Sequence, residues 1–346
     1  MPRIARPSPP KLIVTRRLPA AVEARMAELF EAEFNRDDHP FTAAELVAAA
    51  GRTDVFVPTV TDVIDAQVIA GAGDRLRLIA NFGAGTDHLD LAAAAARGII
   101  VTNTPGVLTE DTADLVMALI LAVPRRLAEG EKLLRSGEWR GWSPTGLVGH
   151  SVTGKALGIL GMGRIGRAVA KRARACGFSI HYHNRERLPA RAERAVGARY
   201  WPRLDDMLQA IDVLTINAPH TAETHHIIDT RRLSLMKRDA YLINAARGAI
   251  VDQDALVEAL ETGIISGAGL DVFPHEPEVH PRLLPLPNVV LLPHMGSATF
   301  EGRAAMGAKV IANIRAWADG HRPPDQVLEG WAQSPSPSGE GLERGA

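Results

Sequence analysis

The sequence is poor in cysteine, in aromatic side chains and in net charge, and these shortages exclude several classes of protein. Cys176 is the single cysteine of the 346 residues, so the chain can form neither an intrachain disulfide nor a thiolate cage for a metal. Its formal net charge is -1, which argues against nucleic acid or an acidic membrane as the main partner. No apolar run approaches the roughly 20 residues of a membrane span, and the start of the chain lacks the apolar core of a secretory signal. These absences predict a soluble protein of the reducing cytoplasm.

The length and the hydrophobic pattern predict two folded domains of the α/β class. A chain of 346 residues is about twice as long as a usual single domain. Short apolar segments of strand type alternate with helical stretches, which is typical of parallel sheets. One series has strands at 11–15, 55–57, 78–80 and 99–101, and a second has strands at 156–160, 179–183, 213–217, 240–245, 265–271 and 289–292.

The remaining segments are expected to be helices, an arm and a tail. Helical spacing predicts one helix over 20–34, a single long helix over 109–135 and a closing helix over 301–317. Residues 136–155 are rich in Gly, Trp and Pro without a period, so we expect an ordered arm there. Residues 331–346 are Ser, Pro, Gly and charge, and we expect them to be disordered.

A glycine-rich string follows the strand at 156–160 and opens the next helix. Its glycines are Gly161, Gly163 and Gly166, in the G-x-G-x-x-G spacing. The first glycine permits a tight turn, the second lets the backbone approach a pyrophosphate, and the third lets helix and strand pack closely. The N–H groups at the helix N-terminus favour phosphate. The string therefore predicts a dinucleotide site.

The end of the following strand predicts which dinucleotide binds. An NAD site usually has Asp or Glu about 20 residues after the glycines, to accept from the ribose hydroxyls. Here Asn184 stands at that place, and Arg185 and Arg187 follow it. Two guanidinium groups suit the 2′-phosphate of NADP. A solvated charged loop is the alternative interpretation.

Three further segments end predicted strands of the second series and carry chemically useful side chains. They contain Arg247, then Asp271 and Glu276, and then His294. Loops beyond the carboxyl ends of parallel strands line the ligand crevice, so these side chains can converge although they are distant in sequence.

Together with the glycine string, these segments resemble the D-2-hydroxyacid dehydrogenase family over roughly residues 45–320. The local sequences at 81–88, 102–106 and 141–144 look most like those of its glyoxylate/hydroxypyruvate reductase branch. The resemblance implies two Rossmann-like, doubly wound domains with the active site in the cleft between them. The substrate-binding domain would take in residues 1–104 and 298–330, and the dinucleotide-binding domain residues 105–297.

The resemblance also implies roles for individual residues in the NADPH-dependent reduction of a small 2-keto acid. His294 would be the proton donor, Glu276 its carboxylate partner and Arg247 the anchor of the substrate carboxylate. The backbone of Ala84 and Gly85 would also bind that carboxylate, and Trp142 of the arm would enter the active site of a neighbouring subunit in a homodimer. The coenzyme-binding set would comprise Thr109, Gly161, Met162, Gly163, Arg164, Ile165, Gly166, Asn184, Arg185, Arg187, Ala218, Pro219, Thr224, Ala245, Ala246, Asp271 and Gly296.

Other interpretations remain open at this point. The chain has Glu276 where formate dehydrogenases have Gln, and Ala84 where phosphite dehydrogenases have Lys, so neither activity is favoured. A D-2-hydroxyacid dehydrogenase that uses NADH, or a dinucleotide-sensing protein of the corepressor type, would have the same fold. His220, His225 and His226 lack carboxylate or thiol neighbours at metal-site spacing, and we predict no metal. Cys176 is expected to be a small packed side chain, and Trp142 can equally be a packing residue.

Overall fold

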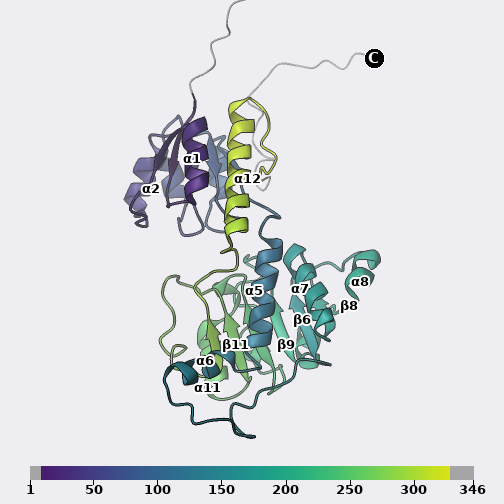
Figure 1. Ribbon diagram of the computed structural model, residues 1–346. Helices are drawn as coiled ribbons and strands as arrows, with labels where there is room; N and C mark the ends of the chain where they lie inside the picture. Colours follow the sequence, from purple (N-terminus) through teal and green to yellow (C-terminus); the bar gives the residue numbers. More distant parts are fainter. Residues whose placement is uncertain (1–8, 328–346) are drawn as a thin grey trace, which may run out of the picture. The chain divides into compact units, whose positions relative to one another are not determined.

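The computed structural model of the protein describes residues 9–327 and divides into two compact units (Figure 1). One unit ends at Val107 and resumes at Phe300, and the other spans Leu108–Thr299. Each unit contains one sheet, and all strand pairs within it are parallel, so the predicted α/β class with two parallel sheets is confirmed. The binding roles that the sequence assigns to the two domains stay predictions. The tail expected at residues 331–346 lies outside the described residues.

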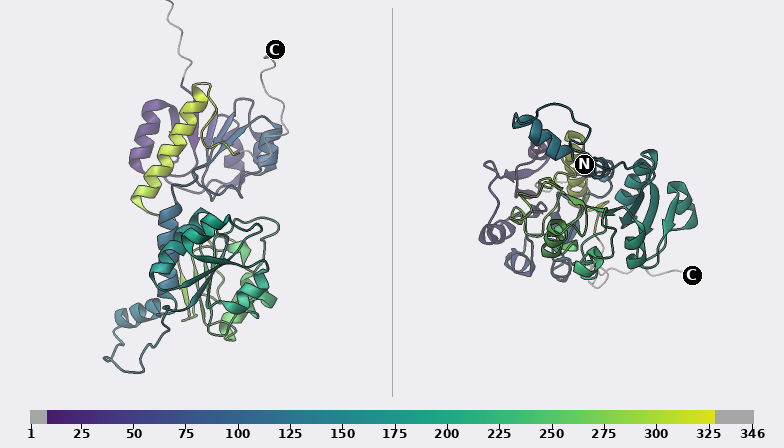
Figure 2. Two further views of the ribbon diagram at one scale, coloured as in Figure 1. Left: turned by 90° about the vertical axis from the view of Figure 1, so that its right-hand side faces the viewer. Right: turned by 90° about the horizontal axis from the view of Figure 1, so that it is seen from below.

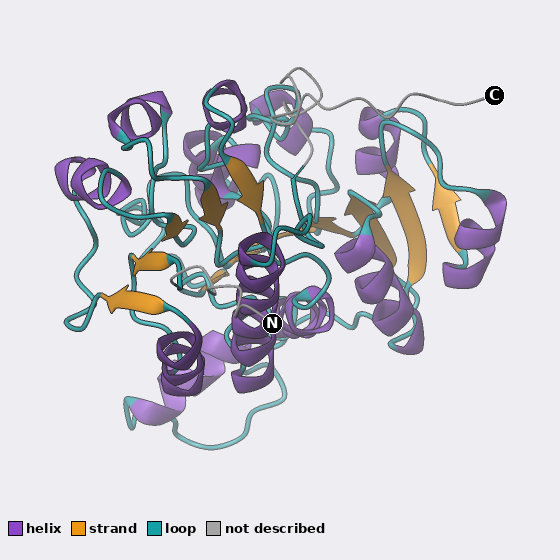
Figure 3. Cartoon of the chain, turned by 90° about the horizontal axis from the view of Figure 1, so that it is seen from above, coloured by secondary structure: helices purple, strands orange, loops and turns teal. Residues whose placement is uncertain are grey.

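The first unit is a sheet of five strands in the order β2-β1-β3-β4-β5, with helices beside it (Figure 3). Its strands are β1 (Lys11–Val14), β2 (Glu31–Phe34), β3 (Val55–Val57), β4 (Leu78–Ala80) and β5 (Ile100–Thr102). Its helices are α1 (Ala20–Leu29), α2 (Ala43–Ala50), α3 (Ala66–Gly71), α4 (Leu91–Ala96) and α12 (Phe300–Ala318). Helix α12 packs beside α1, so the end of the described chain completes this unit.

The prediction of one helix over residues 20–34 is wrong in its second part. Helix α1 ends at Leu29, Phe30 is extended, and Glu31–Phe34 forms the edge strand β2 beside β1. Glu31 and Glu33 are exposed, whereas Ala32 and Phe34 are half-buried, which is the alternation of a strand. Pairing with β1 overrides the helical propensity of this short polar segment.

The second unit is a sheet of seven strands in the order β12-β11-β10-β9-β6-β7-β8. Its strands are β6 (Ala156–Leu160), β7 (Ser179–His183), β8 (Ala198–Tyr200), β9 (Val213–Ile216), β10 (Tyr241–Asn244), β11 (Gly267–Leu270) and β12 (Val289–Leu291). Its helices are α5 (Thr109–Ala122), α6 (Leu127–Arg135), α7 (Arg164–Ala175), α8 (Ala190–Val196), α9 (Leu204–Ala210), α10 (Thr230–Leu233), the 3-10 helix η1 (Gly248–Ile250) and α11 (Gln253–Glu261).

This second sheet is buried on both faces. Val213 of β9 belongs to a hydrophobic cluster on one face, with residues of α5 and α7, whereas Leu214 and Ile216 belong to a cluster on the other face, with residues of α9 and α11. Successive side chains of a strand point to opposite faces, which explains this division. The glycine string and the loops after the strands are therefore mounted on a packed core.

The single long helix expected over residues 109–135 is also a wrong prediction. Helix α5 ends at Ala122, and α6 starts at Leu127 after Arg126 with φ +55°. Pro124 lacks the N–H that would continue the helical hydrogen bonds, and the sequence reading passed over it. Helix α5 packs against α7, whereas α6 has no buried residue. Residues 136–155 contain no helix or strand, and they extend with α6 from the rest of this unit (Figure 2).

Within residues 9–327, the helices are too short or too polar to span a membrane.

Candidate active site

The candidate residues of the second unit lie at one edge of its sheet, where the parallel strands end. Hydrogen bonds continue just past the strands, from Gly161 N to His183 O (3.1 Å), from Asn217 N to Leu160 O (2.8 Å) and from Leu292 N to Leu270 O (2.8 Å). The loops after β6, β7, β9, β10, β11 and β12 thus begin in fixed positions. Parallel topology brings their side chains to the same edge.

The three glycines of the string differ in what a side chain would meet at their positions. Gly161 has φ +95°, and a Cβ there would lie 2.5 Å from the backbone N of Ala218. A Cβ on Gly166 would collide with the carbonyl of Gly161, so helix α7 can approach the strand only with glycine there. A Cβ on Gly163 would meet nothing within 4 Å. The open space at Gly163, before the N-terminus of α7, fits a dinucleotide phosphate.

The three residues of the loop after β7 that are expected to meet the coenzyme differ in their hydrogen bonds. The Oδ1 atom of Asn184 accepts the N–H of Met162 at 2.7 Å, so this side chain braces the glycine loop. Arg185 is exposed. Arg187 donates from Nε and Nη2 to the two carboxylate oxygens of Glu193, both at 2.9 Å. The two arginines therefore have different environments.

Other expected coenzyme residues follow the strands in the same way. Thr224 donates from its hydroxyl to the carbonyl of Pro219 (2.8 Å) and so closes the loop after β9, in which Ala218 is the second residue. The loop after β10 begins at Ala245 and Ala246, and Thr109 opens helix α5. Arg164 and Ile165 form the first turn of α7.

His294 and Glu276 form a direct pair. The Nδ1 atom of His294 lies 2.7 Å from Oε2 of Glu276, and their side chains are 31% and 29% exposed. Oε1 of Glu276 accepts the N–H of Phe273 at 3.0 Å. Burial opposes ionisation of Glu276, but the bonds from His294 and Phe273 and the charge of Arg247 outweigh it and lower the pKa of Glu276. Its carboxylate is thus ionised at neutral pH and can accept from the imidazole.

Asp271 fixes the turn that carries His294. Its two carboxylate oxygens accept the N–H groups of Met295 and Gly296, each at 2.8 Å, and its carbonyl accepts the N–H of His294 at 2.8 Å. His294 has φ +52°, a conformation that these three bonds support. Burial raises the pKa of Asp271, while the two N–H donors oppose the rise. Any contact of Asp271 with a coenzyme would come in addition to this structural role.

Arg247 follows β10, directly before η1. Its carbonyl accepts from the Nδ2 atom of Asn244 at 2.9 Å, and its Nη1 donates to the carbonyl of Ala246 at 2.7 Å. Its positive charge contributes to the lowered pKa of Glu276, so it helps to keep the carboxylate beside His294 ionised. A Cβ on the next residue, Gly248, would collide with the backbone of Phe273. The Arg247 loop is thereby pressed against the loop that leads to Glu276.

In the first unit, Ala84 and Gly85 lie in a loop whose carbonyl groups are held by two asparagines. The Nδ2 atom of Asn81 donates to the carbonyls of Gly83 (3.1 Å) and Gly85 (2.8 Å), and that of Asn103 donates to Ala84 (2.8 Å). Among the described residues, the N–H groups of Ala84 and Gly85 have no hydrogen-bond acceptor. Two adjacent N–H groups of this kind suit a carboxylate.

The histidines of the loop after β9 contact one another. His220 Nε2 lies 3.3 Å from His225 Nδ1, and the rings of His225 and His226 are stacked at 4.0 Å. Within residues 9–327, no three His, Cys, Asp or Glu side chains gather as metal ligands would. The absence of a metal stays a prediction. Cys176 is half-buried at the end of α7, and Trp142 is 85% exposed.

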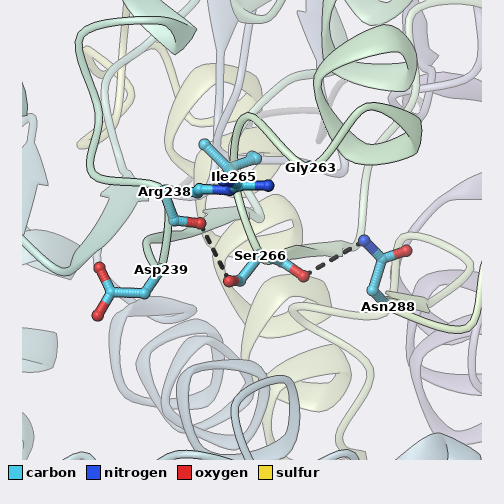
Figure 4. Close-up of a pocket in the computed structure, with 6 residues that line it drawn as sticks. All are labelled: Arg238, Asp239, Gly263, Ile265, Ser266 and Asn288. Carbon is cyan, nitrogen blue, oxygen red and sulfur yellow. Dashed lines mark hydrogen bonds between the residues drawn. The ribbon is translucent and has the colours of Figure 1, made fainter.

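A pocket of the second unit lies at the other edge of the sheet, at the amino ends of β10, β11 and β12. In Figure 4, Ser266 donates to the carbonyl of Arg238 at 3.1 Å, and Asn288 donates to the carbonyl of Ser266 at 3.3 Å. The lining residues are Arg238, Asp239, Gly263, Ile265, Ser266 and Asn288. None of the candidate residues lines this pocket.

The comparison with known families agrees with the site at the carboxyl edge. Residues 117–296 match the family described as D-isomer specific 2-hydroxyacid dehydrogenase, NAD binding domain. A glyoxylate reductase of Thermococcus litoralis is 44% identical over 322 residues, which cover 92% of this chain and 96% of the relative. The chain belongs to the D-2-hydroxyacid dehydrogenase family. The predicted family is thus confirmed, and with it the class of oxidoreductases with an NAD-binding domain.

Solved structures of this dehydrogenase family superimpose on most of the chain. An NADPH-dependent glyoxylate/hydroxypyruvate reductase from Sinorhizobium meliloti, in complex with NADP and malonate, has a TM-score of 0.84 at 38% identity and covers 93% of this chain and 98% of its own. A glyoxylate reductase from Paecilomyes thermophila has a TM-score of 0.83 at 34% identity, with 93% and 99% covered.

Sequence reasoning missed several residues that support the site of this dehydrogenase. Asn244 and Phe273 position Arg247 and Glu276, and Asn81 and Asn103 shape the Ala84 loop. The Oδ1 atom of Asn244 accepts the N–H of Ala246, two residues on, at 3.1 Å, and an asparagine at the end of a strand is a detectable signal for such an Asx turn. The other contacts join loops that are distant in sequence, and their spacing carries no signal.

Proposed function

We propose that this D-2-hydroxyacid dehydrogenase reduces glyoxylate, hydroxypyruvate or a similar small 2-keto acid, with NADPH as the coenzyme. The observation that carries the proposal is the 2.7 Å contact between His294 and the ionised Glu276. The glyoxylate reductases among the relatives support the substrate class, and the NADP complex of the Sinorhizobium reductase supports the coenzyme.

The proposed proton donor is His294. Because Nδ1 faces Glu276, Nε2 is the ring nitrogen that is left for the keto oxygen. The imidazolium transfers its Nε2 proton to that oxygen as the ketone is reduced, and Glu276 stabilises the charged ring beforehand. A bound NADPH would supply the hydride, so one hydride and one proton would convert the keto acid into the hydroxy acid.

Arg247 is the proposed anchor of the substrate carboxylate. Its planar guanidinium can donate two parallel hydrogen bonds to a carboxylate, and a charge beside the keto group also polarises it. Ala84 and Gly85 as further carboxylate ligands, and a site formed jointly by the two domains, stay predictions of the sequence.

A panel of steady-state assays tests the proposed function. Glyoxylate, hydroxypyruvate and pyruvate are reduced with NADPH and with NADH, and glycolaldehyde serves as a matched carbonyl compound without a carboxylate. We expect NADPH oxidation in equal amount to the keto acid consumed, and a kcat/KM for glycolaldehyde at least about 100-fold lower, the loss of one charged anchor. No turnover with any keto acid would favour a dinucleotide-sensing role instead.

Glu276→Gln is expected to change the pH profile of reduction. The pKa of Glu276 is lowered, so its carboxylate supports the imidazolium at neutral pH and loses its charge only as the pH falls through that lowered value. Glutamine has no charge to stabilise the imidazolium, so the alkaline limb of the profile is expected to move to lower pH in the variant. The measurement is kcat/KM for glyoxylate between pH 5 and 10. An alkaline limb in the same place in both proteins would contradict the pairing.

We also propose that the enzyme is a homodimer formed through α6 and the arm. Half of the large apolar side chains exposed in residues 9–327 lie in this stretch, namely Leu127, Leu134, Trp139, Trp142 and Val148. So many exposed apolar side chains in one short stretch are typical of an interface. Light scattering is expected to give about twice the chain mass of 37.1 kDa, and Leu134→Glu is expected to weaken the dimer. A monomeric mass at micromolar concentration would contradict the proposal, and with it the role of Trp142 in a neighbouring active site.

A further inference from the structure

The loop between β7 and α8 is fastened on both sides of Arg185. Before it, Oδ1 of Asn184 accepts the N–H of Met162 at 2.7 Å, and the carbonyl of Asn184 accepts the hydroxyl of Tyr200 at 3.3 Å. After it, the N–H of Leu188 donates to the hydroxyl of Tyr182 at 2.9 Å. Arg185 itself is exposed and makes no hydrogen bond with any described residue. The loop thus presents one guanidinium from a fixed backbone.

Arg187, in contrast, is bound by other side chains of the protein. Its guanidinium forms a two-point pair with Glu193 of α8, at 2.9 Å for each bond, and lies 5.7 Å from the centre of the Tyr200 ring. The same carboxylate accepts the hydroxyl of Tyr182 at 2.6 Å. The side chain of Glu193 is only 9% exposed. Turning Arg187 toward a ligand would leave a buried carboxylate without its cation, which is strongly unfavourable.

The pKa values of the two ionisable groups Glu193 and Tyr182 lie far from neutral pH. The bonds from Arg187 and Tyr182 lower the pKa of Glu193 to about 2, so the carboxylate is ionised at every pH at which the enzyme would work. Burial and the contact with Glu193 raise the pKa of Tyr182 to about 12, so its hydroxyl remains a donor. Around neutral pH the carboxylate of Glu193 is therefore charged and pairs with Arg187, and the hydroxyl of Tyr182 keeps its proton.

We propose that Arg185 is the ligand of the 2′-phosphate and that Arg187 is a positioning residue, which with Glu193 and Tyr182 holds the loop in the shape that presents Arg185. This inference rests on the proposed use of NADPH. It revises the sequence-based expectation that both guanidinium groups meet the phosphate. It also assigns a part in coenzyme choice to Tyr182 and Glu193, which a bound coenzyme would not touch.

Glu193→Gln tests the assignment because the two possible roles of Arg187 predict opposite changes in the affinity for the 2′-phosphate. If Arg187 bound the phosphate directly, removal of the competing carboxylate would free it and strengthen phosphate binding. If Arg187 positions the loop, the same change loosens the loop and weakens phosphate binding. The probes are adenosine 2′,5′-bisphosphate and adenosine 5′-monophosphate, which differ only in the 2′-phosphate, and calorimetry of the full-length protein gives a Kd for each.

The ratio of the monophosphate Kd to the bisphosphate Kd isolates the contribution of the 2′-phosphate. We expect Glu193→Gln to lower this ratio by about 3- to 30-fold, the range of one weakened charge-assisted contact, while the Kd of the monophosphate stays unchanged. Arg185→Gln, which removes the ligand itself, is expected to bring the ratio close to one. An unchanged or higher ratio in Glu193→Gln would overturn the assignment.

Two matched variants separate the effect of the loop's position from the effect of its charge. Glu186→Gln removes one negative charge from the same exposed loop without touching the network, so its ratio should stay the same or rise slightly. Tyr182→Phe removes a hydrogen bond of the network without any change in charge, so its ratio should fall, and it replaces Glu193→Gln if that variant does not fold. A wild-type ratio near one would contradict the proposed NADPH preference. A high wild-type ratio that is unchanged in Glu193→Gln and in Tyr182→Phe would contradict only the role of Arg187.

Discussion

Replacement of His294 by alanine is expected to lower kcat for glyoxylate reduction by roughly 10²- to 10⁴-fold, the usual loss when a general acid is removed. His294 is the imidazole beside Glu276, and water would have to supply the proton in its absence. The hydride donor and the carboxylate anchor remain, so the variant should keep measurable turnover. Steady-state kinetics at the optimum pH of the wild-type enzyme give the comparison.

The loss must appear in the chemical step to support this role. The Kd of NADPH measured without keto acid should change little, because the His294 side chain is expected to meet the substrate rather than the coenzyme. His321→Ala is the matched control, since His321 is an exposed histidine after α12 and its removal should leave kcat unaltered. A His294→Ala enzyme with near-normal kcat would show that the proton comes from another group.

The second large effect is expected in coenzyme choice. NADPH carries a ribose phosphate with nearly two negative charges, and a well-placed guanidinium contributes roughly 1.5–3 kcal/mol per charge-assisted bond. Solvent at the exposed Arg185 screens part of this, so we expect the wild-type kcat/KM to favour NADPH by about 10- to 1000-fold.

The double change Asn184→Asp and Arg185→Ala is expected to reverse that preference, mainly through KM. Aspartate can accept the N–H of Met162 as the asparagine does, so the glycine loop should keep its brace. The new carboxylate offers the ribose acceptor of an NAD site and repels the phosphate. The measurement is kcat/KM for both coenzymes in both proteins.

Arg185→Ala alone is the informative control for the double change. It should weaken NADPH use without improving NADH use, because it removes a phosphate ligand but adds no ribose acceptor. A wild-type enzyme that prefers NADH would contradict the interpretation of Asn184 and Arg185 as an NADP pattern.

The sequence predicts those parts of the site that depend on strand order and on local motifs. The glycine string Gly161–Gly166 can be recognised from the sequence alone, because each of its glycines is required for a separate steric reason. Arg247, Glu276 and His294 follow strands of one parallel sheet, and topology alone brings them to one edge. Their neighbourhood could therefore be predicted, although their roles await the measurements above.

The contacts that sequence reasoning could not supply are those set by packing. Glu193 lies in a short helix that carries no strong periodicity, and nothing local shows that its carboxylate turns inward to Arg187. Asp271 was expected to face a coenzyme, and only the structure shows its two N–H donors from the His294 turn. The break at Pro124 was readable, because proline ends a helix for local reasons.

The tight approach between Gly248 and the backbone of Phe273 has a practical consequence for redesign of the enzyme. Libraries that randomise the Arg247 loop to admit bulkier acids would normally include its neighbours. Any residue with a side chain at 248 would push the two loops apart and carry Arg247 away from Glu276, whatever the new residue offered to the substrate. Diversity is better placed elsewhere, and position 248 is one that a directed-evolution experiment should leave as it is.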